Sequence, residues 1–277
     1  MSAKVWIDGR FHDKLDAKVS VFDHGMLFAD GVTVATRIYD GRLFRIDEVL
    51  SRLYSAAYRI ELNLPYSPLR LRTIVQTTVD ENRRREGYVR ILATRGAGTL
   101  SLDPRKCDPC VVVIAEDVVP YPRELYDSGL DVITCPQLRN SSNDLDRAQQ
   151  SMAKRAALRA GCLDAILCNS RHSVLGSTDA AVFVVREKSL IGPLINDCPD
   201  PEAAQLVFEL AREIGLHATE RDVVPAELAT ASEIFLAGQA GEVIAVRSVD
   251  GQTIGTGSEG PITRQLRTLY REAVRRL

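Results

Sequence analysis

The chain has 277 residues, of which 45% are hydrophobic and 26% are charged, as expected for a soluble globular protein of one large or two smaller domains. Its formal net charge of −2 gives no electrostatic basis for binding nucleic acid or an anionic membrane. No segment approaches the roughly 20 consecutive apolar residues of a membrane span, and the N-terminus lacks the apolar core of a signal peptide. We therefore expect a cytoplasmic protein with neither nucleic-acid nor membrane partners.

The chain contains six cysteines, which in a reducing compartment are expected to be free thiols. Cys107 and Cys110 have the spacing of half a zinc site or of a redox pair. No second pair of cysteine or histidine ligands follows at a suitable spacing. The sequence therefore predicts two unlinked thiols here and no metal site.

The first third of the chain reads as strands broken by turns. Asp8-Gly9 and Asp40-Gly41 lie between short apolar runs and predict hairpins, because both residues of such a turn tolerate positive φ. Apolar residues then recur at helical spacing over residues 46–60 and again over 71–79. Strand character returns at residues 88–94 and 111–115.

A proline-rich segment follows the last of these strands. Residues 118–122 read Val-Val-Pro-Tyr-Pro, and prolines remove backbone donors and bias the preceding residues toward extended conformations. We predict a linker at residues 119–126 between a smaller N-terminal domain, 1–118, and a larger C-terminal domain, 127–277.

The second half predicts strands near residues 130–135, 165–168, 180–185, 234–237 and 243–249, and helices near 144–160, 201–215 and from 262 onward. The combination is α+β in two domains. Five arginines recur at helical spacing in the last helix and are expected to form its solvated face: Arg264, Arg267, Arg271, Arg275 and Arg276.

Several short blocks stand in a characteristic order and spacing along nearly the whole chain. They include Phe-Asp-His-Gly (22–25), Ser-Arg-Leu (51–53), Tyr-Val-Arg (88–90), Arg-Asn-Ser (139–141) and Gly-Pro-Ile-Thr (260–263). Together they resemble the class IV aminotransferases, pyridoxal phosphate (PLP) enzymes of fold type IV. The resemblance is nearest to branched-chain amino acid aminotransferases, with D-amino-acid aminotransferases and aminodeoxychorismate lyase as further relatives. It implies a two-domain α+β fold and a homodimer.

The resemblance also implies a lysine that holds PLP as a Schiff base and moves the substrate proton. Alignment backward from the helix that contains Lys154 places Asn143 at that position. The interval between residues 139–141 and this helix is also several residues shorter than in the family, so the lysine-bearing loop is either substituted or deleted. Lys154 is a possible substitute, but the family carries a lysine here beside the catalytic one, which favours a solvent-facing helix lysine.

Two further parts of the implied cofactor site are altered. The glutamate that the family places by the pyridine nitrogen falls on Gly176, which has no side chain. Asp179 is nearby but displaced, and reads equally as a turn residue beside Ser177 and Thr178. The phosphate-binding turn is replaced by Pro-Glu-Ala at residues 201–203, where the proline lacks an N–H group and the glutamate repels phosphate.

Some candidate anion-binding groups remain. Arg52 matches the family's phosphate-binding arginine, and a guanidinium suits that anion. Gln239 stands where the family has a threonine and retains a hydrogen-bond donor. Ser177 and Thr178 complete the set of predicted cofactor-binding or anion-binding residues.

The substrate pocket implied by the resemblance has also changed, because an aromatic residue and a glutamate of the family become Thr33 and Val34. Arg90 and Arg95 are candidates for binding a substrate carboxylate. For each of them an ion pair on a domain surface is an equally open interpretation. His24 is expected to be a structural, hydrogen-bonding histidine.

These changes favour a homologue of branched-chain amino acid aminotransferase that has lost PLP-dependent transamination, with PLP absent or not covalently bound. Such a protein would bind a small anion or an amino or keto acid, or would catalyse a different reaction. One alternative is an active aminotransferase with relocated machinery, in which Lys154 or another lysine reaches the cofactor. A second alternative is a structural partner of an active paralogue.

Overall fold

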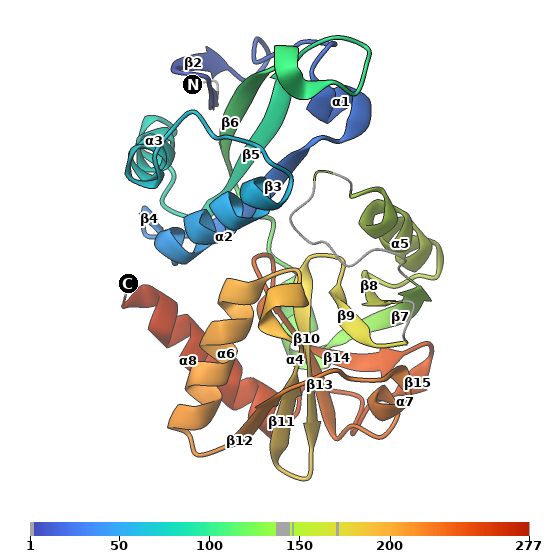
Figure 1. Cartoon of the computed structure of the whole chain (residues 1–277). Coiled ribbons are helices and arrows are strands. Elements are labelled where there is room, and N and C mark those ends of the chain that lie inside the picture. The colour runs from blue at the N-terminus through green and yellow to red at the C-terminus, as the bar shows by residue number, and fades with distance from the viewer. Residues whose placement is uncertain (1–2, 137–144, 146, 170–171, 277) are drawn as a thin grey trace. The chain divides into compact units, whose positions relative to one another are not determined.

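The computed structural model describes residues 3–136, 145, 147–169 and 172–276, which form two compact units (Figure 1). The first unit comprises the residues up to Val118 together with Leu145, and the second begins at Val119. No helix or strand covers residues 117–122, and a helix begins at Arg123, within the segment predicted as a linker. Within the described residues, no helix is long and apolar enough to cross a membrane.

The first unit is built on a six-stranded antiparallel sheet with the strand order β2-β1-β6-β5-β3-β4. The strands are β1 (Lys4–Ile7), β2 (Arg10–Asp13), β3 (Gly31–Tyr39), β4 (Arg42–Leu43), β5 (Gly87–Ala97) and β6 (Asp108–Glu116), and the helices are α1 (His24–Phe28), α2 (Ile46–Arg59), α3 (Pro68–Glu81) and the short 3-10 turn η1 (Pro104–Lys106). Asp8, Gly9, Asp40 and Gly41 all have positive φ, which confirms the two predicted hairpin turns.

The core of the first unit lies between the sheet and helices α2 and α3. Leu53 of α2 and Val75 of α3 are fully buried and pack with Val89 and Ile91 of β5. Successive side chains of β5 point to opposite faces of the sheet, so those of Val89 and Ile91 point toward the helices. The intervening side chains, that of Arg90 among them, point to the opposite face, where they are half-buried.

The second unit is built on a nine-stranded mixed sheet with the strand order β12-β11-β10-β13-β14-β7-β8-β9, and β15 pairs with β14. The strands are β7 (Leu130–Pro136), β8 (Asp164–Cys168), β9 (Val174–Ser177), β10 (Ala180–Arg186), β11 (Ser189–Gly192), β12 (His217–Glu220), β13 (Glu233–Gly238), β14 (Glu242–Val249) and β15 (Gln252–Thr253). The helices are α4 (Arg123–Ser128), α5 (Ala148–Arg159), η2 (Ile195–Asp197), α6 (Pro201–Glu213), α7 (Pro225–Leu228) and α8 (Pro261–Arg275). Helix α5 was expected to begin near residue 144, which lies outside the described residues.

Helix α8 is anchored by charged groups as well as by apolar contacts. The buried Glu233 carboxylate of β13 accepts hydrogen bonds from the N–H groups of Ile262 and Thr263 and so caps the helix N-terminus. The Arg267 side chain is only 14% exposed and donates to the buried Glu259 at 2.8 Å. The expectation that all the arginines of this helix are solvated is therefore wrong for Arg267.

Candidate functional site

A small pocket in the second unit gathers several polar side chains from α5, β8 and the turn after β9. The buried carboxylate Oδ1 of Asp164 accepts a hydrogen bond from Thr178 Oγ1 at 2.6 Å and lies 4.0 Å from Lys154 Nζ. Lys154 Nζ also donates to the carbonyl oxygen of Leu163 at 2.5 Å. The pocket is also lined by Tyr121, and its volume is 80 Å³.

These contacts oppose a role for Lys154 as the Schiff-base lysine. A Schiff-base lysine needs its amine free to reach the cofactor aldehyde, whereas Lys154 Nζ is directed to the Leu163 carbonyl oxygen and the Asp164 carboxylate. The Lys154 side chain is 40% exposed, so the helix lysine is partly solvated and partly ion-paired. Burial raises the pKa of Tyr121, and the carboxylates of Asp164 and Asp179 raise it further, so the phenol stays a neutral hydrogen-bond donor.

The pocket is too small to hold PLP by itself, because small-molecule sites commonly enclose about 300–1,000 Å³. A few waters or a small polar group fit the 80 Å³ that it offers. Asp164 was not predicted from the sequence as a site residue. Its position at the start of a fully buried strand is the signal that could have revealed it.

Gly176 lies on β9 with φ of +154°, and the space beside its Cα is filled. A Cβ at this position would lie 2.4 Å from Cδ of Pro199 and 2.9 Å from the carbonyl oxygen of Ala180. The position that the resemblance gives to the pyridine carboxylate therefore has no room for a side chain.

The N-terminus of α6, where the resemblance places the phosphate-binding turn, is capped by the protein itself. Asp200 Oδ1 accepts a hydrogen bond from Ala203 N at 3.1 Å, and Pro201 at the first helical position has no N–H group. Glu202, in the first turn, is buried. The partial positive charge of this helix end is thus matched by carboxylates, which oppose a phosphate at the same place.

The hydroxyls predicted to bind an anion have protein partners. Ser177 is fully buried, and its Oγ accepts a hydrogen bond from Ala180 N at 3.1 Å. Thr178 donates to Asp164, and its carbonyl oxygen accepts from Arg147, which also pairs with Asp179 at 2.7 Å. Gln239 is half-buried in the turn between β13 and β14, where its neighbours on both sides line the small pocket.

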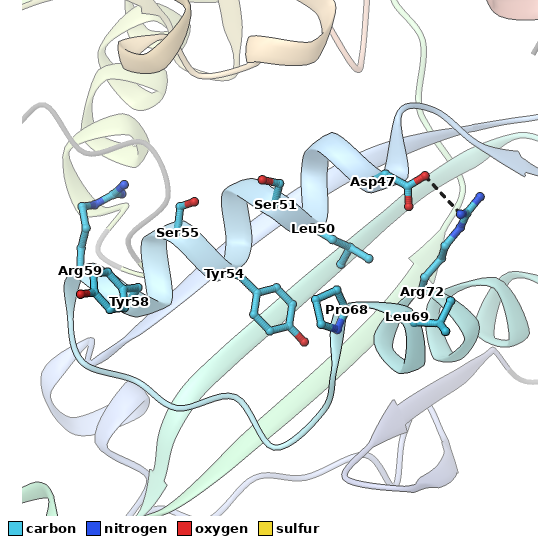
Figure 2. Close-up of a pocket in the computed structure, with 10 residues that line it drawn as sticks. All are labelled: Asp47, Leu50, Ser51, Tyr54, Ser55, Tyr58, Arg59, Pro68, Leu69 and Arg72. Carbon is cyan, nitrogen blue, oxygen red and sulfur yellow. Dashed lines mark ion pairs between the residues drawn. The ribbon is translucent and has the colours of Figure 1, made fainter.

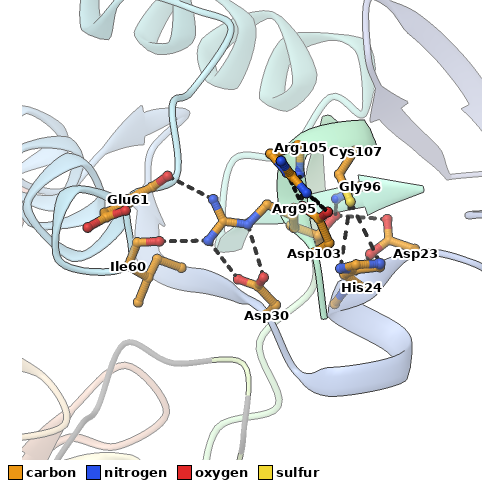
Figure 3. A network of polar contacts seen from close by, with 12 residues as sticks. Asp23, His24, Asp30, Ile60, Glu61, Arg95, Gly96, Asp103, Arg105 and Cys107 are labelled. Atoms are coloured by element: carbon orange, nitrogen blue, oxygen red, sulfur yellow. Dashed lines mark hydrogen bonds and ion pairs between the residues drawn. The ribbon is translucent and has the colours of Figure 1, made fainter. Parts of the chain in front are cut away.

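The three predicted arginines of the first unit have different surroundings. Arg52 is half-buried on α2. Arg90 lines a pocket on the face of the sheet opposite α2 and α3. Arg95 donates to both carboxylate oxygens of Asp30 at 3.0 Å and to the carbonyl oxygens of Ile60 and Glu61 (Figure 3). Asn143, which the resemblance places at the position of the family lysine, lies outside the described residues.

His24 is also held within the first unit. It is fully buried, its Nε2 lies 2.8 Å from the carbonyl oxygen of Thr99, and its ring packs edge-on against Phe28. Cys107 Sγ lies 3.6 Å from Nδ1 (Figure 3), and burial raises the pKa of this thiol. All six cysteines are free, and the described residues contain no cluster of three or more possible metal ligands.

A wider groove of 830 Å³ lies between α2 and α3 (Figure 2). Leu50, Tyr54 and Leu69 contribute to its apolar surface, and an ion pair of 3.2 Å joins Asp47 to Arg72 at one end. None of the site residues predicted from the sequence lines this groove.

Comparison with known proteins gives the family. The sequence model of the amino-transferase class IV family matches residues 32–249. The chain belongs to this family. A putative branched-chain-amino-acid aminotransferase of Methanocaldococcus jannaschii is 34% identical over 97% of this chain and 96% of the relative. A D-alanine aminotransferase of Bacillus licheniformis is 31% identical over 98% of this chain and 97% of the relative.

Solved structures agree with this assignment. A branched-chain aminotransferase of Thermoproteus uzoniensis with norvaline superposes with a TM-score of 0.89 at 27% identity, covering 99% of this chain and 95% of that one. A second branched-chain amino acid aminotransferase, solved with pyridoxamine 5'-phosphate, gives 0.90 at 26% identity, covering 99% of this chain and 94% of that one. The predicted fold-type IV aminotransferase fold is confirmed.

The family is PLP-dependent, but the described residues of the second unit do not fit PLP in the arrangement that the resemblance implies. Pro199 fills the space beside Gly176. Asp200 caps the helix end that would meet the phosphate. The sequence did not predict that Pro199 fills the space expected for the pyridine carboxylate. It also did not predict that Asp200 caps the helix end expected to bind the phosphate.

Proposed function

We propose that this class IV aminotransferase homologue has lost ordinary PLP-dependent transamination, and that it binds a small anion or an amino or keto acid, either as a binding protein or as an enzyme of different chemistry. The start of α6 carries the proposal. A helix N-terminus binds phosphate through free N–H groups and its partial positive charge, and here Pro201 removes one donor while Asp200 supplies a competing carboxylate.

The packing of Pro199 against Gly176 supports the same proposal at the position expected to meet the pyridine ring of the cofactor. A carboxylate beside the pyridine nitrogen keeps PLP an electron sink, and this chain has no space for one at position 176. Asn143, which has no amine, stands at the aligned lysine position.

A covalent trapping experiment tests the proposal. The purified full-length chain is incubated with PLP, reduced with borohydride and mapped by mass spectrometry. We expect no stoichiometric pyridoxyl-lysine. Labelling of one lysine, together with loss of turnover when that lysine is mutated, would restore the aminotransferase.

The second candidate is an active aminotransferase for branched-chain or related amino acids with relocated machinery. The identity of 34% to the M. jannaschii relative over almost the whole chain favours it. Formation of glutamate from 2-oxoglutarate and a branched-chain amino acid, dependent on PLP, would establish this candidate and exclude the first.

We further propose that the chain forms a homodimer, because the first unit exposes many large apolar side chains near its N-terminus. Val21, Phe22 and Met26 are 64%, 49% and 65% exposed. Light scattering at micromolar concentration should give twice the mass of one chain, and a monomer would contradict the proposal. A role as structural partner of an active paralogue would instead give a mixed complex on co-purification.

A further inference from the structure

The groove beside α2 is bordered by a stripe of side chains that runs along this helix. Asp47, Ser51, Tyr54 and Tyr58 form this α2 stripe, at intervals of four, three and four residues, so they lie on one face of the helix (Figure 2). Asp47, Ser51 and Tyr58 are exposed, and 85% of Tyr58 is accessible to solvent. Alternating intervals of three and four residues are those of the seam along which two helices pack in a coiled coil.

The surface beside the α2 stripe is hollow and largely apolar. Leu50 is buried within the groove of 830 Å³, and Leu69, on the first turn of α3, is 75% exposed beside it. A second hollow of 820 Å³ continues past the end of α2 and shares Tyr54, Tyr58 and Arg59 with the first. The hollow surface therefore follows the whole of α2, whose 14 residues span about 21 Å. An elongated groove of this kind suits a helix as its occupant.

The two ends of α2 carry opposite charges. Asp47 and Glu48 are exposed in the first turn, and Arg59 is exposed in the last turn. Asp47 pairs with Arg72 at 3.2 Å, whereas Arg59 forms no hydrogen bond or ion pair with any residue that the structure describes. Two copies of α2 lying antiparallel would bring Arg59 of each copy to the acidic end of the other. This arrangement also places opposite ends of the two helix dipoles together.

The α2 stripe is also self-complementary about a two-fold axis. In an antiparallel pair centred between positions 52 and 53, Tyr54 of one copy lies opposite Ser51 of the other, and Tyr58 lies opposite Asp47. A large side chain then faces a small one, which allows close packing of the two helices. The Tyr58 hydroxyl, which has no hydrogen-bond partner among the described residues, faces a carboxylate that can accept its hydrogen bond.

We propose that α2 packs antiparallel against α2 of a second copy of this chain, with the α2 stripe as the seam. This face is separate from that of Val21, Phe22 and Met26, none of which lines either hollow. The contact uses little more than one helix from each copy, which is less than the roughly 800 Å² per partner of a standard interface. The association is therefore weak, and it adds to the homodimer as the concentration rises.

Sedimentation velocity of the full chain, from micromolar to submillimolar concentration, tests the inference. We expect the average mass to rise with concentration. Arg59→Glu should weaken this association about tenfold or more, because a two-fold contact contains the Arg59 interaction twice. Glu48→Arg should also weaken it, and the exchange variant that combines Glu48→Arg with Arg59→Glu should restore it, which a misfolded chain would not do. Tyr58→Ala, which removes an aromatic side chain from the seam, should weaken it as well.

Arg159→Glu is the matched control, because Arg159 is likewise an exposed arginine in the last turn of a helix, and it should associate like the unaltered chain. Met26→Asp alters the face proposed for the homodimer, and the association that depends on Arg59 should survive in it. The test is thus separate from the homodimer and from PLP trapping. Equal association of the unaltered chain and Arg59→Glu would overturn the inference. So would a mass that stays constant over the whole range, because the groove would then be left for a helix of a different protein.

Discussion

Pro199 occupies the space that a side chain at position 176 would need, since a Cβ on Gly176 would lie 2.4 Å from Pro199 Cδ. The proline ring is part of the chain that leads into α6, so it cannot move aside as the end of a flexible side chain would. The position that the resemblance gives to the pyridine carboxylate therefore holds a glycine, and Pro199 fills the space beside it.

Gly176→Ala should consequently destabilise the protein by about 2–4 kcal/mol, through overpacking against Pro199 and the carbonyl oxygen of Ala180. Gly161→Ala is the control, because Gly161 also has positive φ but nothing within 4 Å of the added Cβ. It should cost only about 1 kcal/mol, from backbone strain. Urea unfolding measures both, and equal losses for the two variants would show that the space beside Gly176 is open.

Asp200 provides a second test, because Asp200→Asn keeps the cap but removes its charge. Asparagine is as good an N-cap as aspartate, so stability should change by less than about 0.5 kcal/mol, whereas Asp200→Ala should lose about 1 kcal/mol. With the carboxylate gone, inorganic phosphate should raise the melting temperature of Asp200→Asn more than that of the unaltered chain. Equal phosphate effects on both would show that this carboxylate does not exclude the anion.

The sequence predicts the hairpins and the helix–sheet layers because both follow from local patterns. Asp-Gly turns need positive φ, and apolar periodicity marks the faces that pack in the core. The different surroundings of Arg90 and Arg95 cannot be predicted in this way, since both stand on one strand. The register of β5 with β6 shifts between Thr94 and Ala97, and Arg95 in this irregular stretch pairs with Asp30.

The small pocket of the second unit was unpredictable for a related reason. Lys154, Asp164 and Thr178 lie on α5, at the start of β8 and in the turn after β9, and only the pairing of β8 with β9 brings the last two together. Position 176 is a further example. The sequence shows that it is a glycine, but it does not show that Pro199 fills the space beside that glycine.

Two thiols, those of the half-buried Cys110 and the buried Cys168, should be unreactive in the native protein. Burial raises the pKa of Cys110 to about 12 and that of Cys168 to about 11, so almost no thiolate forms at neutral pH. We expect iodoacetamide at pH 7 to modify both only after denaturant is added. Peptide mapping of samples alkylated with and without urea provides the measurement, and rapid labelling of Cys110 in the folded chain would contradict the expectation.

An ion pair in the second unit should make stability depend on acid pH. Arg221 holds the pKa of Glu227 well below its usual value of 4.5, at about 2, through two hydrogen bonds of 2.9 and 2.7 Å. A carboxyl whose pKa is lower in the folded state stabilises the protein at pH values above its unfolded pKa. This stabilisation is lost as the pH falls from about 4.5 through about 2.

Glu227→Gln should therefore lower the free energy of unfolding at pH 7 by about 1–2 kcal/mol, a range that allows for the solvent-exposed Arg221 partner. Its deficit relative to the unaltered chain should shrink as the pH falls from 4.5 toward 2, because both chains then carry a neutral group at position 227. Glu187→Gln, at an exposed turn, is the control and should leave the pH profile unchanged. Urea unfolding at a series of pH values measures the difference, and a deficit that stays constant down to about pH 2 would show that Glu227 does not titrate with the fold.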